Sequence, residues 1–417
     1  MMNFWLSIAL CGMTYFGLAT GRWPGLKLDR ATIALVGATA LLVSGALGLT
    51  ESIAAVNFET LLLLFGMMIL VAFLRLSGFF ERLGTWLFDT VIDPVAALAL
   101  TVALSGVMSA FLVNDVICLA FTPLLIQLCR RLQLNPLPFL LALATAANIG
   151  SAGTIIGNPQ NMIIGSLSQI AYARFAFKLF PPALLGLLAD FVIIAYLYRG
   201  QLRSTHPALR QRAVVSEGLR SRMLGRVFNV ALFTTLATVV LFFAGFPIAL
   251  VALGAAAFLF LVLGQIRPAR IYQEIDWGLL VMFTGLFVVV HAFEIHVIHR
   301  WNPESWTFLT TNPIGFLSLT SAVLSNLVSN VPAVLLFKPL MPIIPEVLRE
   351  DAWLSLAMSS TFAGNLTVLG SVANLIVVES ARRDGVHISF WNYFRVGFPV
   401  TLVTLAIGYG WLTWFHY

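Results

Sequence analysis

The sequence contains an internal duplication, and this feature constrains the fold more than any other. Asn114 precedes Pro123 by nine positions, and Asn330 precedes Pro339 by the same interval. The apolar segments around these sites also match, and each recurs after an interval close to half of the 417-residue chain. Paired apolar segments that Gly, Pro and Asn interrupt at corresponding places indicate the two repeats of a membrane transporter, with its binding site at the interruptions.

The composition indicates a membrane protein. Hydrophobic residues make up 59% of the sequence and charged residues 10%, with a mean hydropathy of +0.93, whereas soluble domains carry about 25% charged residues. We therefore expect an all-α, polytopic protein of the cell (inner) membrane. Residues 3–19 have no charged start or clear cleavage site, so we interpret them as a retained first helix. The net charge of +6 comes from short basic loops and does not indicate a nucleic-acid partner.

Apolar length predicts about ten transmembrane helices. Two of them, residues 137–171 and 353–379, contain Gly and Thr breaks and are predicted to be broken helices. Residues 94–130 and 312–346 each hold two apolar helices. The connection between these helices is too short for a polar loop between two full spans, so we expect two re-entrant hairpins. Because unpaired backbone at membrane depth must face protein or a cavity, the four interruptions should meet around one cavity. The remaining spans are expected at 3–20, 31–49, 59–79, 178–199, 227–244, 247–264, 277–298 and 395–415.

The basic residues indicate the orientation of the chain. With the amino terminus outside, 19 of the 24 Lys and Arg residues fall in inside segments, as the positive-inside rule expects. The halves then run in opposite directions across the bilayer. Residues 1–199 are predicted to form the first inverted repeat and residues 227–417 the second. Residues 200–226 are Arg-rich, without a long apolar run, and are predicted to form a cytoplasmic linker.

The sequence lacks the motifs of several other protein classes. No G-x-x-x-x-G-K-[ST] motif occurs, so nucleotide hydrolysis by this chain does not drive it. The three cysteines have neither disulfide nor metal spacing, and no nucleophile–base constellation indicates an enzyme. We expect no resident cofactor or metal, only H⁺ or Na⁺ as a coupling ion. Four residues at the end of a span are interpreted as interfacial polar groups: His291, Glu294, His296 and His299.

Asp115 is the main candidate for coupling. It follows Asn114 at the first predicted hairpin tip, and its counterpart in the second repeat is Val331. The fold therefore does not require a charge at this position. A buried, unpaired carboxylate is costly, so Asp115 should bind a proton, a cation or a cationic side chain. The alternative is that Asp115 only caps the second helix of the hairpin.

Neutral polar residues at the tips and breaks are candidate binding groups. Amides and hydroxyls both donate and accept hydrogen bonds, and helix amino termini favour anions. For each Asn, a helix cap or an interhelical hydrogen bond is the alternative role. No Lys or Arg lies at a tip or break, and Lys338 is expected to reach the outer interface. The candidate substrate- or ion-binding residues are Asn114, Asp115, Ser151, Thr154, Gly157, Asn158, Asn161, Asn330, Thr367, Gly370, Ser371 and Asn374.

These residues resemble the ion transporter superfamily, and most closely its arsenite permease and anion permease branch. The resemblance rests on the hairpin tips, the Thr-x-x-Gly breaks at Thr154 and Thr367, and residues 387–395. The tips read Val-Asn-Asp and Ser-Asn-Val, whereas the sodium–dicarboxylate branch has Ser-Asn-Thr at both. The resemblance implies an elevator-like motion, often in a homodimer. For an arsenite pump it also implies a separate ATPase subunit.

The sequence thus predicts a secondary-active transporter of a small inorganic or oxyanion-type solute, coupled to protons. Arsenite or antimonite efflux by antiport is the leading hypothesis. A sodium- or proton-coupled carboxylate or inorganic-anion permease is one alternative, and a Na⁺/H⁺ antiporter is another.

Overall fold

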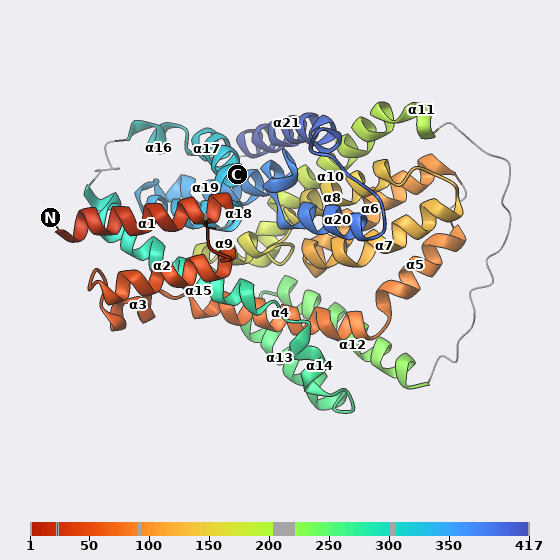
Figure 1. The fold of residues 1–417 in the computed structure, drawn as a ribbon, viewed down its shortest axis with the longest axis horizontal. Coiled ribbons are helices and arrows are strands. Elements are labelled where there is room, and N and C mark those ends of the chain that lie inside the picture. The colour runs from red at the N-terminus through yellow and green to blue at the C-terminus, as the bar shows by residue number, and fades with distance from the viewer. Residues whose placement is uncertain are drawn as a thin grey trace.

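The computed structural model describes residues 2–21, 23, 25–90, 93–202, 222–300 and 306–415. Within these ranges every regular element is a helix (Figure 1), so the all-α prediction is confirmed. The first half contains α1 (Met2–Thr20), α2 (Arg30–Val43), α3 (Leu49–Ala55), α4 (Phe58–Leu76), α5 (Phe79–Thr90), α6 (Pro94–Leu112), α7 (Asn114–Arg131), α8 (Leu137–Ser151), α9 (Pro159–Ser168), α10 (Tyr172–Leu197) and α11 (Arg199–Leu202).

The second half repeats this order. Its helices are α12 (Arg222–Phe243), α13 (Ile248–Val262), α14 (Pro268–Gln273), α15 (Trp277–His296), η1 (Ile298–Arg300), α16 (Thr307–Thr311), α17 (Pro313–Val328), α18 (Asn330–Phe337), η3 (Lys338–Ile343), α19 (Glu346–Ala363), η4 (Val368–Gly370), α20 (Val372–Arg383) and α21 (Phe390–Trp414). Both predicted broken helices are present, as α8 with α9 and as α19 with α20. Both predicted hairpins are present, as α6 with α7 and as α17 with α18.

Six of the described helices are long and apolar enough to cross a bilayer: α4, α6, α10, α12, α15 and α21. Length alone does not separate a full span from a hairpin arm, because α6 has 19 residues and yet ends inside the molecule. The sequence reasoning also missed the short helices α3, α5, α14 and α16, because they lie between the long apolar stretches from which the spans were predicted.

The packing of the helices follows an approximate twofold relation between the halves. Helix α2 packs against α15, and its counterpart α13 packs against α4, the counterpart of α15. Likewise α6 packs on α8 as α17 packs on α19, and α10 packs on its own counterpart α21. In Figure 1 the α6–α7 hairpin extends to the right of the molecule and α16 and α17 to the left. This arrangement is the one that inverted repeats produce.

The boundaries of the repeats and the side of the membrane that each end faces stay predictions. Most of the Arg-rich linker, residues 203–221, lies outside the described residues. On either side of it, α11 ends at Leu202 and α12 begins at Arg222.

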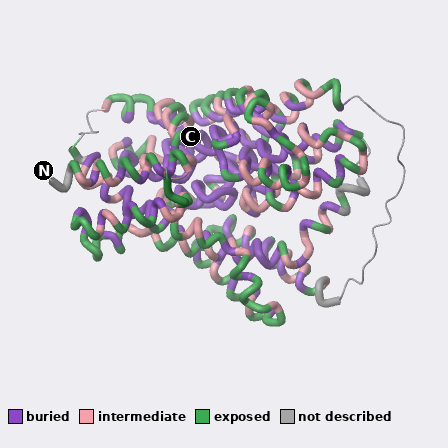
Figure 2. The backbone as a smooth tube through the Cα atoms, in the orientation of Figure 1, coloured by how far each residue is buried: buried purple, intermediate pink, exposed green. Residues whose placement is uncertain are grey.

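The most deeply buried helices are those that contain the breaks. In α8 every residue from Pro138 to Ser151 is buried, and in α19 every residue from Asp351 to Ala363. Figure 2 shows the buried residues gathered in the middle of the molecule, where these helices lie. A helix that is apolar all round belongs in the interior, so polar side chains on α8, α9 and α19 must find partners among themselves.

Candidate functional site

Each hairpin turns at a single residue with left-handed backbone geometry. Val113 has φ 67° and Ser329 has φ 77°, and neither is glycine. Such geometry costs about 1–3 kcal/mol for a residue with a side chain and gathers at functional sites. Asn114 and Asn330 follow immediately as the first residues of α7 and α18. The Asn114 amide N–H donates to the Gly157 carbonyl at 3.0 Å, which joins the first tip to the first break.

The two breaks are held by equivalent asparagines. Asn161 Nδ2 donates to the Ser151 carbonyl at 3.2 Å and to the Thr154 carbonyl at 2.9 Å. Asn374 Nδ2 donates to the carbonyl oxygens of residues 364 and 367, at 2.7 and 3.0 Å. The acceptor residues of the second repeat follow those of the first by the same interval that separates Asn374 from Asn161. Both amides therefore shape the break, and their amino groups have no hydrogen left for a solute.

The glycines of the breaks are required by close backbone approach. A Cβ on Gly157 would lie 2.2 Å from the Ser151 carbonyl oxygen, and a Cβ on Gly370 would lie 2.7 Å from the Gly364 carbonyl oxygen. Because real Cβ atoms do not approach oxygen so closely, these positions admit only glycine without a shift. Gly157 and Gly370 thus act on the shape of the site rather than as ligands.

The remaining predicted residues of the breaks mostly hold helix ends. Asn158 is the N-cap of α9 and accepts from the Asn161 amide at 2.9 Å, while its Nδ2 donates to Ser151 Oγ at 2.9 Å. Thr154 Oγ1 donates to the carbonyl of Ala110 on α6. Ser371 caps α20. Thr367 precedes η4 without a side-chain cap.

The sequence reasoning missed Asn148, on which the polar network converges. Its Oδ1 accepts from Asn114 Nδ2 and from Ser371 Oγ, both at 3.0 Å. Its Nδ2 donates to Asn365 Oδ1 and to Asn374 Oδ1, both at 2.9 Å. One side chain thus connects the first hairpin tip with the break of the second repeat. The only sequence signal was a polar residue within the apolar run of α8.

Gln160 and Thr361 form a second connection that the sequence reasoning missed. Gln160 Nε2 donates to Thr361 Oγ1 at 3.1 Å. The amide orientation of Asn330 is assigned from its neighbours. In that orientation its Nδ2 donates to the carbonyls of Gly370 and Ser360, at 3.1 and 3.2 Å, and its Oδ1 accepts from Gln160 Nε2 at 3.3 Å. The second tip is therefore bonded to both breaks.

The two tips line one cavity of about 520 Å³. The amino-terminal residues of α9 and α20 line it as well, so the prediction that tips and breaks share a cavity is confirmed. Of the candidate residues, four lie on its wall and eight lie behind the wall. Those on the wall are Asn114, Asp115, Asn330 and Ser371. That any of them binds a solute stays a prediction.

The charged side chains on this cavity are mostly acidic. Asp29, Asp115 and Asp276 line it together with the single guanidinium of Arg30. Hydrogen bonds from the Thr32 hydroxyl and amide hold the pKa of Asp29 below its ordinary value, so this carboxyl is ionised at neutral pH. The wall therefore offers little compensation for a multiply charged anion.

Asp115 occupies the second position of α7 and does not cap it. The N-cap is Val113, without a side-chain hydrogen bond, and the Asp115 amide donates to Asn114 Oδ1 at 3.0 Å. The alternative that Asp115 only caps the helix is therefore wrong. Asp115 also lines an adjoining cavity of about 200 Å³, where Arg75 pairs with Glu274 at 2.5 Å. No ion pair in the described part of the chain involves the Asp115 carboxyl.

The polar residues at the end of α15 form a cluster, and its place at the membrane–water interface stays a prediction. His291 lies 3.7 Å from Glu51 and 3.9 Å from Glu294, and Lys338 lies 3.9 Å from Glu294. His296 Nε2 contacts the Ala46 carbonyl at 2.9 Å, and the side chain of His299 lies outside the described residues. Among described residues, no group of three His, Cys, Asp or Glu side chains has the geometry of a metal site.

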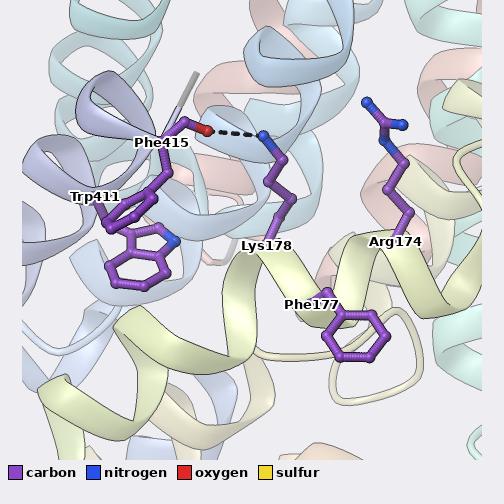
Figure 3. A pocket seen from close by; sticks show the side chains of 5 residues that line it. All are labelled: Arg174, Phe177, Lys178, Trp411 and Phe415. Carbon is purple, nitrogen blue, oxygen red and sulfur yellow. Dashed lines mark hydrogen bonds between the residues drawn. The ribbon is translucent and has the colours of Figure 1, made fainter. Parts of the chain in front are cut away.

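A separate pocket of about 500 Å³ lies between α10 and α21, away from the tips (Figure 3). Lys178 Nζ donates to the Phe415 carbonyl at 2.9 Å and lies 3.8 Å from Asp351. Arg174 pairs with Glu350. The aromatic and basic lining of this pocket is typical of a membrane–water interface, and its cations already have partners.

Comparison with known proteins identifies the family. The model of a family described as citrate transporter matches residues 15–345. The chain belongs to this citrate transporter family. An uncharacterised transporter of Mycobacterium tuberculosis is 31% identical over 413 residues, covering 93% of this chain and 95% of the relative. A silicon efflux transporter of Oryza sativa subsp. japonica is 30% identical over 454 residues, covering 92% of each chain.

A solved structure agrees with the fold of this family member. The Alcanivorax borkumensis YdaH transporter superposes with a TM-score of 0.58, covering 99% of this chain and 96% of that one at 14% identity. This likeness concerns the fold alone. The resemblance to the ion transporter superfamily is confirmed, and the protein is a multi-pass membrane transporter.

Proposed function

We propose that the protein is a proton-coupled antiporter of the cell membrane that exports a small inorganic oxyacid, with arsenite and antimonite as the leading solutes. The observation that carries this proposal is the charge of the cavity wall. Three carboxyls and one guanidinium face the space between the tips. A solute that is uncharged, or nearly so, enters such a cavity without an uncompensated electrostatic cost.

The cavity offers hydrogen-bonding groups that suit hydroxyl-bearing solutes. Helices α7, α9, α18 and α20 all begin at its wall, and the first amides of a helix have no partner within the helix. The Asn114 and Asp115 amides are already bonded at the first tip. Oxygen atoms of a hydroxylated solute can accept from the backbone amides of Gln160, Val331 and Val372, and the partial positive charge of the helix ends supports them. Solute hydroxyls can in turn donate to Asn330, Gln160 and Ser371.

Asp115 is the coupling residue in this proposal. Its carboxyl faces the cavity next to the first tip and has no counterpart in the second repeat. An ionised carboxylate in this position attracts a proton or a small cation. Binding of the proton removes a negative charge from the wall, so solute and proton occupancy influence each other. The silicon efflux relative supports outward transport of a small oxyacid.

The family description favours one other function, a carboxylate permease. Citrate carries several negative charges, and the acidic wall opposes it unless cations enter with it. A sodium requirement for citrate uptake, together with no effect of the protein on arsenite, would support that alternative and refute the proposal.

A growth test separates these functions. Expression in a host that lacks its own arsenite pump should raise the tolerated arsenite and antimonite concentrations. Asp115→Asn should abolish this resistance, whereas Asp351→Asn, beside Lys178 and away from the tips, should retain it. If the wild-type protein is expressed at a normal level and the host remains as sensitive to arsenite as before, the arsenite assignment is refuted. The test in a host without an ATPase partner also shows whether this chain acts alone.

A further inference from the structure

Asp190 is a buried carboxyl that the proposed transport site does not use. It lies on α10 with 0% of its surface exposed. Neither of its carboxyl oxygens has a hydrogen-bond partner among the described residues. An ionised carboxylate without partners in such surroundings is costly by several kcal/mol. This group must therefore hold a proton or a cation.

The neighbour of Asp190 on α8 favours a proton. Gly186, one turn earlier on α10, packs against Ile149 of α8. Asp190 lies one turn after Gly186 on α10, and Thr145 lies one turn before Ile149 on α8. The two side chains therefore face each other. The Thr145 hydroxyl already donates to the Leu141 carbonyl at 2.9 Å. While it makes this bond, it presents lone pairs to Asp190, to which the carboxyl can bond only if it carries a hydrogen. A Thr145 hydroxyl turned toward Asp190 would instead donate to the carboxylate.

The fold does not require a carboxyl at this place. Pro181 of α10 corresponds to Pro399 of α21, and Asp190 and Gly408 stand at equal intervals beyond these prolines. A Cβ on Gly408 would lie 2.1 Å from Met358 Sδ. In the second repeat, methionine thus fills the space that the carboxyl occupies in the first. Asp190 is an addition to the first repeat, as Asp115 is.

A chain of buried amides links Asp190 to the first hairpin tip. Asn365 Nδ2 donates to the Thr145 carbonyl at 3.2 Å, and Asn148 Nδ2 donates to Asn365 Oδ1 at 2.9 Å. Asn114 Nδ2 then donates to Asn148 Oδ1 at 3.0 Å. A rearrangement of the tip during transport therefore changes the groups packed around Thr145 and Asp190.

We propose that Asp190 is a second proton-binding site, which takes up one proton as a neutral carboxylic acid and releases it during the transport cycle. This inference rests on the proposed proton coupling. The titratable group that interacts with it is Tyr393 of α21, whose hydroxyl also lacks a partner among described residues. Of the other titratable groups of α21, Arg395 interacts with Tyr198, two turns beyond Asp190 along the chain, and Tyr409 is exposed. Helices α6 and α8 carry no titratable side chain, and the charged side chains of α11, α12 and α19 lie in their first two turns.

The protonation of Asp190 can be measured without any solute. Infrared spectra of the purified protein at neutral pH should contain a carboxylic-acid C=O band that Asp190→Asn removes. Asp351→Asn is the matched control, because Asp351 lies near Lys178 and should contribute no such band. Thr145→Val should shift the band, because it removes the acceptor. Spectra of Asp190→Asn that retain the whole band would overturn the proposal.

Transport measurements then test the release of the proton. In proteoliposomes with arsenite as the probe, Asp190→Asn should lower the number of protons exchanged per arsenite, and Asp190→Glu should restore it. A purely structural carboxylic acid predicts a wild-type ratio in Asp190→Asn, because asparagine also donates a hydrogen bond, and that result would overturn the proposal. If wild-type protein moves no arsenite, the proposed function fails, while the infrared test still decides whether Asp190 holds a proton.

Discussion

Replacement of Asn148 tests whether one side chain holds the two repeats together at the site. Asn148→Ala removes four hydrogen bonds of 2.9–3.0 Å to groups on α7, α20 and the break after α19. Asn148 is 1% exposed, so water does not readily replace the amide. A matched control is Thr361→Ala, since Thr361 precedes Asn374 by the same interval as Asn148 precedes Asn161 and is equally buried.

The bond geometry gives the expected magnitudes. A buried hydrogen bond contributes about 0.5–1.5 kcal/mol, and a partner left unsatisfied costs about 1–3 kcal/mol. Asn148→Ala leaves Asn114 Nδ2, Asn365 Oδ1 and Asn374 Oδ1 without this partner. We therefore expect the free energy of unfolding to fall by about 3–5 kcal/mol. Thr361 accepts only two bonds, at 3.1 and 3.3 Å, so its replacement should cost about 1–2 kcal/mol.

The assay can use the protein's own cysteines. Cys11, Cys118 and Cys129 are free and buried, so a thiol-reactive dye reports unfolding of detergent-purified protein. The midpoint temperature should fall further for Asn148→Ala than for Thr361→Ala, and arsenite flux per folded molecule should fall as well. Equal shifts for the two variants would refute the reasoning that the network converges on Asn148.

Four further outcomes are expected. Asp115→Asn should leave solute binding measurable and abolish pH-gradient-driven transport in proteoliposomes, and full pH-dependent transport in this variant would exclude Asp115 as the coupling group. Asn330→Ala should impair transport while the protein still folds, since it removes three neutral hydrogen bonds of 3.1–3.3 Å that contribute only about 0.5–1.5 kcal/mol each; aggregation on size-exclusion chromatography would contradict this. External thiol labelling of intact cells should reach a cysteine at Asn302 and miss one at Arg212, and the reverse pattern would overturn the orientation. Asp29→Ala should lower thermal stability by about 0.5–2 kcal/mol, because it removes the N-cap of α2; an unchanged midpoint would show that the cap contributes nothing.

The hairpins and breaks could be predicted because their signals are local and occur twice. Asn114 and Asn330 stand at the same interval before a proline, and glycine-rich breaks follow each at similar distances. Chain reversal inside an apolar segment requires a residue that leaves helical geometry, and the structure places it one residue before each Asn, at Val113 and Ser329. The repeat made the position of both turns visible without any tertiary information.

The network behind the cavity could not be predicted, because it depends on which helix faces meet. Asn148 stands alone within the apolar run of α8, and Gln160 lies in the polar segment of the first break, between Pro159 and Asn161. Nothing local shows that these side chains point toward Asn365 or Thr361. The sequence reasoning also grouped most polar residues of the breaks, Asn161 and Asn374 among them, as binding candidates. Asn161 and Asn374 instead donate their amino hydrogens to backbone carbonyls of their own breaks, which only the folded geometry reveals.

The comparison between the repeats separates the requirements of the fold from those of the chemistry. Residues that the fold requires are the same in both repeats. Asn161 and Asn374 hold the breaks together by hydrogen bonds, and Gly157 and Gly370 allow the close approach of the backbone. At three places where the repeats differ, the first carries the amide or the carboxyl.

Asn148 stands where the second repeat has Thr361, Asp115 where it has Val331, and Asp190 where it has Gly408. The second repeat in turn carries Asp276 where the first has Asn57, and Asn365 where the first has Ala152. Both repeats therefore add their own polar groups to a shared frame, and the two sets meet in the hydrogen bond from Asn148 to Asn365 and on the cavity that Asp115 and Asp276 line.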